Sequence, residues 1–597
     1  MSAAYARALA AAADTPPRAQ VHWTDRIGQL ALLAVGLVLS LVLLAPISMI
    51  LIKSVQDRDG NFIGLQLFQS YLHTPALLQS IWNSVWVASV VTLVTVPAAL
   101  IFAYALTRSA MPCKPLARNV ALVPLLAPSL LSAISFIYWF GNQGLLKNPF
   151  GLQTVYGAPG IIGALVYATF PHALMILITA LSLTDGRLYE AADSMGTSTR
   201  RKFFTITLPA AKYGLISAAT VVFTYSISDF GIPKVIGGNF NMLATDIFKL
   251  VIGQHDFGRG AVVSLMLLLP VLLTYAADHV VQSKQQAHLT AHSVPFTPKP
   301  SRWFDCAMAS YCALVCALML AVLGMAVWAS FVTLWPYNLG FTLRHYRMGL
   351  VDAGIFVSYL NSVQMALWCA TLGTTFVFAG AYLLEKTRGM TLLRGLIRLL
   401  AILPMGVPGL VLGLGYIFFF NHPANPLNVL YHSMAILVLS TVVHYYTSSH
   451  LTAVTALKQI DNEFEAVSAS LKVPWFRTFA RVTVPVCLPA ILDISRYLFV
   501  TAMTTISAVV FLYSPETTLA ALAILNLDEA GEIGPAAAMA TLIVATSATV
   551  CLVYYLLDRF LVRNTQAWRR PAAPELAPAA HPQPRTLTPR HGKGPSA

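Results

Sequence analysis

The stretch "EAADSMGTSTRRKFFTITLP", from Glu190 to Pro209, is a polar, helix-prone segment that lies between long apolar runs. A second segment of similar wording, "EAVSASLKVPWFRTFARVTVP", begins at Glu465, again between apolar runs. The two starting points are 275 residues apart. A polar insert that recurs at such a spacing indicates a duplicated structural unit, so the rest of the chain has to be assigned around these two segments.

The composition excludes a soluble protein. Of the 597 residues, 57% are hydrophobic and only 10% are charged, whereas a soluble domain carries about 25% charged residues. The chain is therefore an integral membrane protein. Its net charge of +14 would suggest nucleic acid in a soluble protein, but here we expect no nucleic-acid partner. The seven cysteines form no CxxC pair, so neither a metal site nor a disulfide is predicted.

Apolar runs long enough to cross a bilayer recur along the whole chain. A membrane helix needs about 20 such residues, and internal prolines are tolerated because neighbouring groups satisfy the freed carbonyls. We predict twelve spans, at 28–52, 81–107, 119–140, 161–183, 213–233, 261–282, 304–334, 357–384, 397–420, 432–456, 487–513 and 536–558. The first of these is too long for a signal-peptide core, and we interpret it as an uncleaved anchor.

Lysine and arginine collect on one side of these spans. With the N-terminus in the cytoplasm, 29 of the 38 basic residues fall on the cytoplasmic side, as the positive-inside rule requires. This predicts a multi-pass protein of the bacterial inner membrane with both termini cytoplasmic. Both polar segments then lie on the cytoplasmic side, because six spans separate them.

Other phrases repeat at a similar offset. "NSVWVASVV", from Asn83, resembles "NSVQMALWC", from Asn361, and Pro124 and Pro128 correspond to Pro404 and Pro408. The predicted fold class is all-α, with two parallel six-helix repeats. The predicted parts are a cytoplasmic N-terminal segment (1–27), a first six-helix domain (28–283) with its polar loop (185–212), a cytoplasmic linker (284–303), a second six-helix domain (304–560) with its polar loop (458–485), and a disordered cytoplasmic tail (561–597).

The first polar segment reads as two short helices with a break. "RLYEAADSMG" places Leu188, Ala191, Ala192 and Met195 on one face. Gly196 can end that helix in a left-handed conformation, and Thr197 or Ser198 can cap the next one, before Pro209 at the head of the following span. A single segment of this kind would be read as a solvated loop. A pair at equivalent repeat positions predicts two protrusions that dock onto a two-fold symmetric partner.

The residues of the first segment carry a family resemblance. They match the cytoplasmic signature of ABC-importer permeases at Glu190, Ala191, Ala192, Gly196, Ile206, Leu208 and Pro209. In the second segment Glu465, Ala466 and Pro485 match, whereas Leu471 stands in place of the glycine and one extra residue precedes the final proline. The resemblance implies that all these positions couple the membrane domain to an ATPase, and that the fold is a duplicated type I importer domain.

The resemblance also implies partners. The chain has no GxxxxGK[ST] loop, so we expect no cofactor in this chain, with ATP bound by two separate ATPase subunits and substrate delivered by a periplasmic binding protein. Phrases such as "FPHALMILITALSL" most resemble permeases for 2-aminoethylphosphonate, which is the expected cargo. Permeases for ferric iron or thiamine are the alternatives, since they also occur as fused chains.

Polar residues near the spans are candidates for the transport path, because polar groups in a membrane are costly. We select Asp229 and Lys234, which could equally form a local charge pair, and Thr504 and Thr505, which could instead bond back to helix carbonyls. Two other functions stay open. An ion-coupled secondary transporter can show the same repeat but has no use for two polar protrusions, and a membrane enzyme would need a catalytic motif such as HExxH, which is absent.

Overall fold

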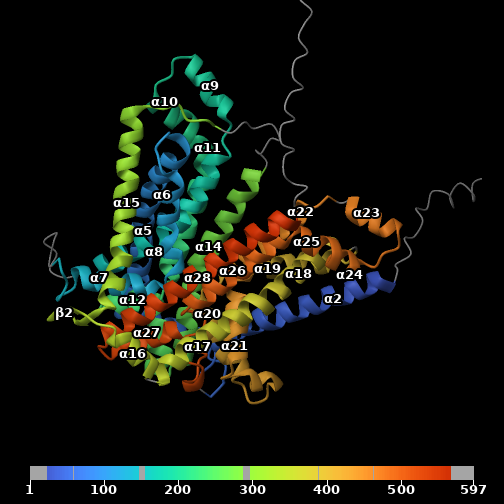
Figure 1. Cartoon of the computed structure of the whole chain (residues 1–597). Helices are drawn as coiled ribbons and strands as arrows, with labels where there is room; N and C mark the ends of the chain where they lie inside the picture. The colour runs from blue at the N-terminus through green and yellow to red at the C-terminus, as the bar shows by residue number, and fades with distance from the viewer. Residues whose placement is uncertain are drawn as a thin grey trace, which may run out of the picture.

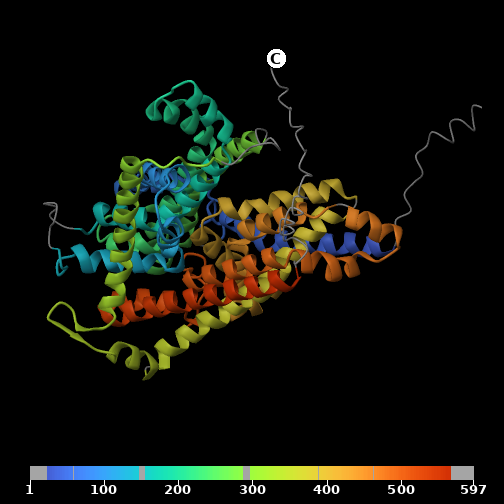
Figure 2. The ribbon, with the colours of Figure 1, turned by 45° about the horizontal axis from the view of Figure 1, so that its top comes forward.

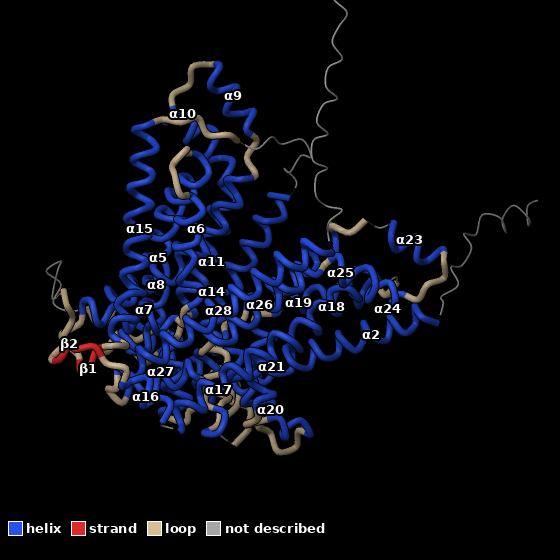
Figure 3. The backbone as a smooth tube through the Cα atoms, in the orientation of Figure 1, coloured by secondary structure: helices blue, strands red, loops and turns tan. Residues whose placement is uncertain are grey.

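The computed structural model describes residues 23–57, 59–146, 155–286, 296–351, 353–387, 389–461 and 463–565. Within these ranges the protein is built almost entirely of helices, with one short antiparallel hairpin, β1 (Val332–Leu334) and β2 (Asn338–Phe341) (Figure 3). The predicted linker lies partly outside the described residues, as do most of the predicted N-terminal segment and nearly all of the predicted tail.

The first half of the chain carries the helices up to the linker. They are α2 (Trp23–Leu39), η1 (Ser40–Leu44), α3 (Ala45–Lys53), α4 (Gln66–Leu72), α5 (Pro75–Arg108), α6 (Lys114–Leu122), η2 (Val123–Leu126), α7 (Ser129–Phe140), α8 (Ala158–Ser182), α9 (Gly186–Ser194), α10 (Thr199–Lys202), η3 (Phe203–Thr207), α11 (Leu208–Ser228), α12 (Gly231–Ile236), α13 (Leu243–Phe248), η4 (Lys249–Gly253) and α14 (Phe257–Gln286).

The second half follows the same plan. Its helices are α15 (Arg302–Ala329), α16 (Arg344–Val351), α17 (Ala353–Trp368), η5 (Cys369–Gly373), α18 (Thr374–Lys386), α19 (Thr391–Ile402), η6 (Leu403–Gly406), α20 (Gly409–Phe420), η7 (Pro426–Leu430), α21 (Met434–His444), α22 (Tyr446–Lys458), α23 (Glu463–Ser470), α24 (Trp475–Thr478), η8 (Phe479–Thr483), α25 (Val484–Val486), α26 (Leu488–Thr504), η9 (Pro515–Thr517), α27 (Ala520–Glu529) and α28 (Ile533–Thr565).

Each predicted span contains a helix or a bent pair of helices, although the predicted spans 304–334 and 487–513 run past the helix ends at Ala329 and Thr504. Among the described residues, eight helices are long and apolar enough to cross a membrane, and three bent pairs raise the number to eleven when each pair counts as one span. The remaining predicted span, 432–456, corresponds to the short apolar helix α21 and its continuation α22. Two of the bends, of 101° and 115°, precede Ser129 and Gly409, where Pro128 and Pro408 interrupt the backbone hydrogen bonding of equivalent spans.

The duplication extends to individual hydrogen bonds on the side opposite the polar loops. The Asn83 side chain on α5 donates to the carbonyl of Asn241 (3.0 Å), just before α13. Its repeat counterpart Asn361, on α17, donates to the carbonyls of Glu516 (2.8 Å) and Thr518 (3.0 Å), just before α27. The "NS" phrase that marked the repeat is therefore a clamp that fixes the chain between the fifth and sixth spans of each half.

The serines of the same phrase complete the clamp. The Ser84 hydroxyl accepts a hydrogen bond from the amide of Leu243 (2.8 Å), and the Ser362 hydroxyl accepts one from the amide of Ala520 (2.7 Å). Leu243 and Ala520 are the first residues of α13 and α27. Each serine thus satisfies an amide at a helix start that has no partner within its own helix.

The first helix of each half packs against the opposite half. α2 contacts α18 and α19, and α15 contacts α5, α6 and α7 as well as α28 of its own half. Hydrogen bonds join α15 to the first half. Among them, Trp139 Nε1 of the first half donates to the carbonyl of Ala321 (3.1 Å), and the Tyr311 hydroxyl of α15 donates to the carbonyl of Ala98 (2.8 Å). The sequence repeat and the packing unit therefore differ, because the first predicted span of each six-helix domain is exchanged.

The two halves meet at one end and separate toward the other. In Figure 1, α12, α16 and α27 lie at the end where the halves come together, whereas α9 and α23 lie at the ends of two diverging bundles. Figure 2 shows the same divergence from a second direction. The described chain starts beside the second polar loop, because Trp475 Nε1 donates to the carbonyl of Thr24 (2.9 Å).

Candidate functional site

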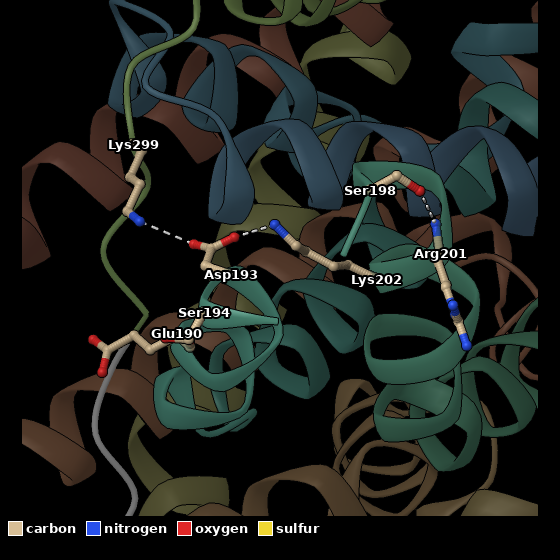
Figure 4. Close-up of polar contacts among 7 residues, drawn as sticks. All are labelled: Glu190, Asp193, Ser194, Ser198, Arg201, Lys202 and Lys299. Carbon is tan, nitrogen blue, oxygen red and sulfur yellow. Dashed lines mark hydrogen bonds and ion pairs between the residues drawn. The ribbon is translucent and has the colours of Figure 1, made fainter. Parts of the chain in front are cut away.

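The first polar loop forms the predicted pair of short helices, α9 and α10. Asp185 caps α9 by accepting a hydrogen bond from the amide of Arg187 (3.0 Å). Gly196 has a φ of +67°, a left-handed conformation in which a side chain is strained, and this turn ends the first helix. Ser198 caps α10 by accepting from the amide of Arg201 (Figure 4). Of the two predicted caps, Ser198 is the one used.

The outward face of α9 differs in one residue from the prediction. Leu188 and Met195 are 53% and 76% exposed, and Ala191 is exposed as well. Ala192, predicted on the same face, is buried instead. It lies on the inner side with Tyr189, whose hydroxyl is 2.8 Å from that of Thr207. The loop thus presents three apolar residues away from the membrane domain.

The two acidic residues of α9 have different surroundings. Glu190 is exposed, and its carboxylate makes no ion pair with any residue that the structure describes. Asp193 lies between two ammonium groups, with Lys202 in direct contact and Lys299 at 3.0 Å (Figure 4). Hydrogen bonds from Lys202 and Lys299 hold the pKa of the Asp193 carboxyl below its ordinary value. Glu190 remains available to a partner, whereas Asp193 serves the loop itself.

The second polar loop, α23 and α24, repeats this geometry in a register that the sequence comparison missed. Asp461 accepts a hydrogen bond from the amide of Glu463 as Asp185 does from Arg187. The left-handed turn falls at Lys472, with φ +54°, and not at Leu471. From Asp461 to the turn the second loop has the same number of residues as the first. The extra residue inferred from the sequence is therefore not an insertion.

This register changes the counterpart of Glu465. It is equivalent to Tyr189, the inner residue of α9, and Glu190 is equivalent to Ala466. The Glu465 carboxylate turns back to the membrane domain and forms an ion pair with Lys386 (2.8 Å), in which the two side chains are only 25% and 13% exposed. The two glutamates matched from the sequence are therefore not equivalent in space.

The other predicted coupling residues follow the two loops. Ala466 and Leu471 are exposed on the second loop. Ile206 and Leu208 are half-buried on the continuation of α10 into α11, where a π-helical turn (η3) joins the two without a break. Pro209 and Pro485 stand in the first turns of α11 and α25.

A comparison with known protein families bears on these loops directly. A family described as the binding-protein-dependent transport system inner membrane component matches residues 95–286 and again 377–565, which together make up more than half of the chain. The chain belongs to this family. It is a membrane permease of the importer class, with two copies of the family domain in one polypeptide, and each copy contains one of the two polar loops.

The permease resembles several curated proteins along its length. It is 26% identical over 541 residues to the ferric transport system permease protein FbpB of Actinobacillus pleuropneumoniae, covering 88% of this chain and 77% of that protein. A ferric transport system permease protein of Haemophilus influenzae is 26% identical over 476 residues, covering 77% and 74%. The spermidine/putrescine permease PotB of Haemophilus influenzae is 25% identical over 258 residues, covering 40% of this chain and 90% of its own.

The predicted path residues Asp229 and Lys234 do not pair with each other. Asp229 directly follows the last residue of α11, and its carboxylate accepts a hydrogen bond from the amide of Ile232 (2.9 Å). The Lys234 ammonium crosses to the other half of the permease and contacts the carboxylate of Glu529 on α27 at 2.7 Å. Lys234 is therefore a contact between the two halves, and the local charge pair considered from the sequence is wrong.

The threonines of the second half behave as helix residues. The Thr504 hydroxyl donates to the carbonyl of Val500 (3.0 Å) within α26. Thr504 therefore bonds back to its own helix, as the alternative interpretation of the sequence had it. Thr505 is buried directly after the last turn of α26. It stands where Asp229 stands in the first half, directly after the fifth span.

Several tyrosines at the boundary between the halves were not selected from the sequence. Tyr225, on α11, lies against His172 with ring centroids 4.5 Å apart. Tyr445 and Tyr497, from the second half, lie with their ring centroids 6.0 Å apart. Their sequence context is apolar, so only the tertiary arrangement identifies them as a group.

Proposed function

We propose that this permease forms the translocation pathway of an ATP-driven importer whose cargo is ferric iron. The observation that carries the transport mechanism is the pair of loops α9–α10 and α23–α24. Each is a compact helical protrusion at an equivalent repeat position, with exposed apolar residues on its outer face. Two such protrusions fit two ATPase subunits, which would bind and hydrolyse ATP, since this chain has no GxxxxGK[ST] phosphate-binding loop.

The ATPase pair would drive alternation between two states. Closure of the two subunits would draw the loops together, and because the halves diverge on the loop side (Figure 1), that movement would close this side and open the other, as in a rigid-body switch. A periplasmic binding protein would deliver the cargo to the end that carries α12 and α27, with the loops and both termini on the cytoplasmic side. The roles of all the predicted coupling residues belong to this proposal.

The choice of ferric iron over 2-aminoethylphosphonate rests on two supports. The relatives that cover most of this chain are named as ferric permeases. Tyr225 and Asp229 of the first half, and the contacting pair Tyr445 and Tyr497 of the second half, carry phenol and carboxyl oxygens. Oxygen donors suit hard cations, whereas a phosphonate anion would gain more from Lys234, which is held by Glu529.

Uptake into cells or proteoliposomes that contain the permease, its ATPase and its binding protein tests both parts. We expect ATP-dependent uptake of radiolabelled ferric iron that is abolished by Glu190→Lys and insensitive to a protonophore. Parallel samples receive labelled 2-aminoethylphosphonate and thiamine. Uptake of either in place of iron would replace the cargo and keep the mechanism. Uptake that continues without the ATPase and collapses with the protonophore would establish ion-coupled transport instead.

A further inference from the structure

We propose that each coupling loop is held in position by the first helix of the opposite half of the permease or by the linker segment that leads into that helix. Residues 296–299, which lead into α15, would position the loop α9–α10, and the start of α2 would position the loop α23–α24. This cross-bracing rests on the proposed role of the loops, and it assigns Phe296, Lys299 and Trp475 as positioning residues.

The first brace is a cluster in which Arg108, Tyr189 and Phe296 all contact one another, with the two ring centroids 4.7 Å apart. The Arg108 guanidinium at the end of α5 lies 4.7 Å from the ring centroid of Tyr189 and 4.7 Å from that of Phe296. Arg108 is buried, and its Nη2 donates to the carbonyl of Leu181 (2.7 Å). Both rings supply electron-rich faces to the buried cation. Since Tyr189 belongs to α9 and Phe296 to the segment before α15, the cluster joins the coupling loop to the linker that leads into the other half.

An ion pair next to this cluster attaches α9 to the same segment a second time. The Lys299 ammonium lies 3.0 Å from the Asp193 carboxylate, which Lys202 of the same loop also contacts (Figure 4). Lys299 is 78% exposed, so the pair alone contributes little stability. The pair instead orients α9, because it fixes which side of this helix faces residues 296–299. Because the pKa of the Asp193 carboxyl is lowered, the attachment persists below the pH at which an ordinary aspartate becomes protonated.

In the second brace the first half of the permease contacts the coupling loop of the second half. Trp475, the first residue of α24, donates its indole N–H to the carbonyl of Thr24 at the start of α2 (2.9 Å). Gly28, one turn further along α2, also lies beside this indole, since a Cβ atom there would be in ordinary contact with its nitrogen at 3.5 Å. Thr24 is buried. The first helix of the first half thus holds the coupling loop of the second half.

The exchange of α2 and α15 gives these contacts a mechanical consequence. Each first helix packs along the opposite half, and α2 itself at Thr24, or the segment leading into α15 at Lys299, touches that half's coupling loop. A displacement of either loop is therefore passed to a helix that is continuous with the other half. Both halves would then switch together even when the ATPase subunits act on the loops unequally.

A spin label tests the first brace without any transport. Met195, which is 76% exposed on α9, is replaced by cysteine and labelled after the exposed Cys113 and Cys306 are changed to serine. In the full-length permease, Phe296→Ala with Lys299→Ala should at least double the mobile fraction of the label. Thr297→Ala, at an exposed neighbour in the same segment, is the matched control and should leave the spectrum unchanged, as should Lys299→Arg.

Transport measurements test the consequence. In proteoliposomes with ATPase and binding protein, the Phe296/Lys299 double variant and Trp475→Ala should each lower cargo uptake per ATP hydrolysed by about fivefold, the lower end of typical coupling between sites. Thr297→Ala should retain the normal ratio. An unchanged label spectrum in the double variant overturns the bracing whatever the transport result. A looser loop with an unchanged uptake ratio overturns its role in coupling, and absence of ATP-dependent uptake in the unmodified permease refutes the proposed function alone.

Discussion

Glu190 and Glu465 occupy different environments although they begin the same phrase. Glu190 projects from α9 toward solvent, and Glu465 is tied to Lys386 at the end of α18. Lys386 stands in its repeat where Arg108 stands in the first half, and Glu465 stands where Tyr189 stands. The same inner contact is therefore a cation on an aromatic ring in one half and an ion pair in the other.

This difference predicts unlike outcomes for one substitution. Glu190→Lys should abolish ATP-coupled uptake while the permease keeps its thermal stability, because the side chain has no internal partner to lose. Glu465→Lys should lower the stability, since it places two ammonium groups together in a half-buried site. The charge-swapped variant Glu465→Lys with Lys386→Glu should recover most of that loss. Thermal unfolding and uptake, measured on all three, decide the matter; failure of the swap to restore stability would contradict the assignment.

The two left-handed turns give a second contrast. Gly196 adopts φ +67° without strain, whereas Lys472 adopts φ +54° with a side chain, which costs about 1 kcal/mol. We expect Lys472→Gly to stabilise the second loop by roughly 0.5–1 kcal/mol, an amount reduced by the greater conformational freedom of glycine in the unfolded chain. We expect Gly196→Val to destabilise the first loop by about 1–2 kcal/mol. Local hydrogen exchange of the two loops measures both. Equal effects of the two substitutions would contradict the register given above.

Close approaches between equivalent elements use glycine on opposite partners in the two halves. In the first half Gly231, at the start of α12, faces Ser129 at the start of α7, and a Cβ at Gly231 would lie 2.7 Å from the serine oxygen. In the second half Gly409, at the start of α20, faces Ser507, and a Cβ at Gly409 would lie 2.4 Å from that oxygen. The contact is kept while the glycine changes sides.

Alanine at these glycines should have graded effects. At Gly409 the new methyl group also meets the backbone nitrogen of Ala508 at 3.0 Å, whereas at Gly231 its neighbours are side chains. We expect Gly409→Ala to cost about 2–3 kcal/mol and Gly231→Ala about 1–2 kcal/mol, within the usual range for overpacking. Ser129→Gly should relieve most of the cost of Gly231→Ala. Thermal unfolding of the purified variants checks the order, and a larger cost at Gly231 would contradict it.

The permease is joined at the end opposite the coupling loops. Lys234 on α12 contacts Glu529 on α27, and the ring of Phe248 stacks near that of Phe511 with centroids 6.2 Å apart. Both contacts link the two halves where the bundles come together (Figures 1 and 2). Under the proposed mechanism they belong to the inward-open state and must separate when the other state forms.

Removing the ion pair between Lys234 and Glu529 should therefore shift the equilibrium between the inward-open state and the other state of the permease. A partly exposed pair contributes at most about 1 kcal/mol, so Lys234→Ala should raise ATPase activity in the absence of binding protein by no more than about fivefold. The swapped variant Lys234→Glu with Glu529→Lys should return the activity to its normal level. ATPase assays in nanodiscs measure this, and unchanged activity in Lys234→Ala with raised activity in the swap would contradict a role for the pair.

The sequence by itself determined the membrane class, the places of the spans and the two polar loops at equivalent repeat positions. These features are local, because a helix in lipid must be apolar along its own length and a polar insert such as 190–209 must leave the membrane where it stands in the chain. The repeat of Asn83 at Asn361 was visible for the same reason, since both fill one clamp.

Only the tertiary structure decided which distant residues meet. The partner of Lys234 is Glu529 and that of Glu465 is Lys386, and neither pairing leaves a periodic trace in the sequence. The exchange of α2 and α15 is likewise invisible locally, because an apolar helix can satisfy its surface against either half. The register of the second loop was misjudged because the two loops were aligned by residue identity. The backbone turn at Lys472 and the cap at Asp461 fix the register in space.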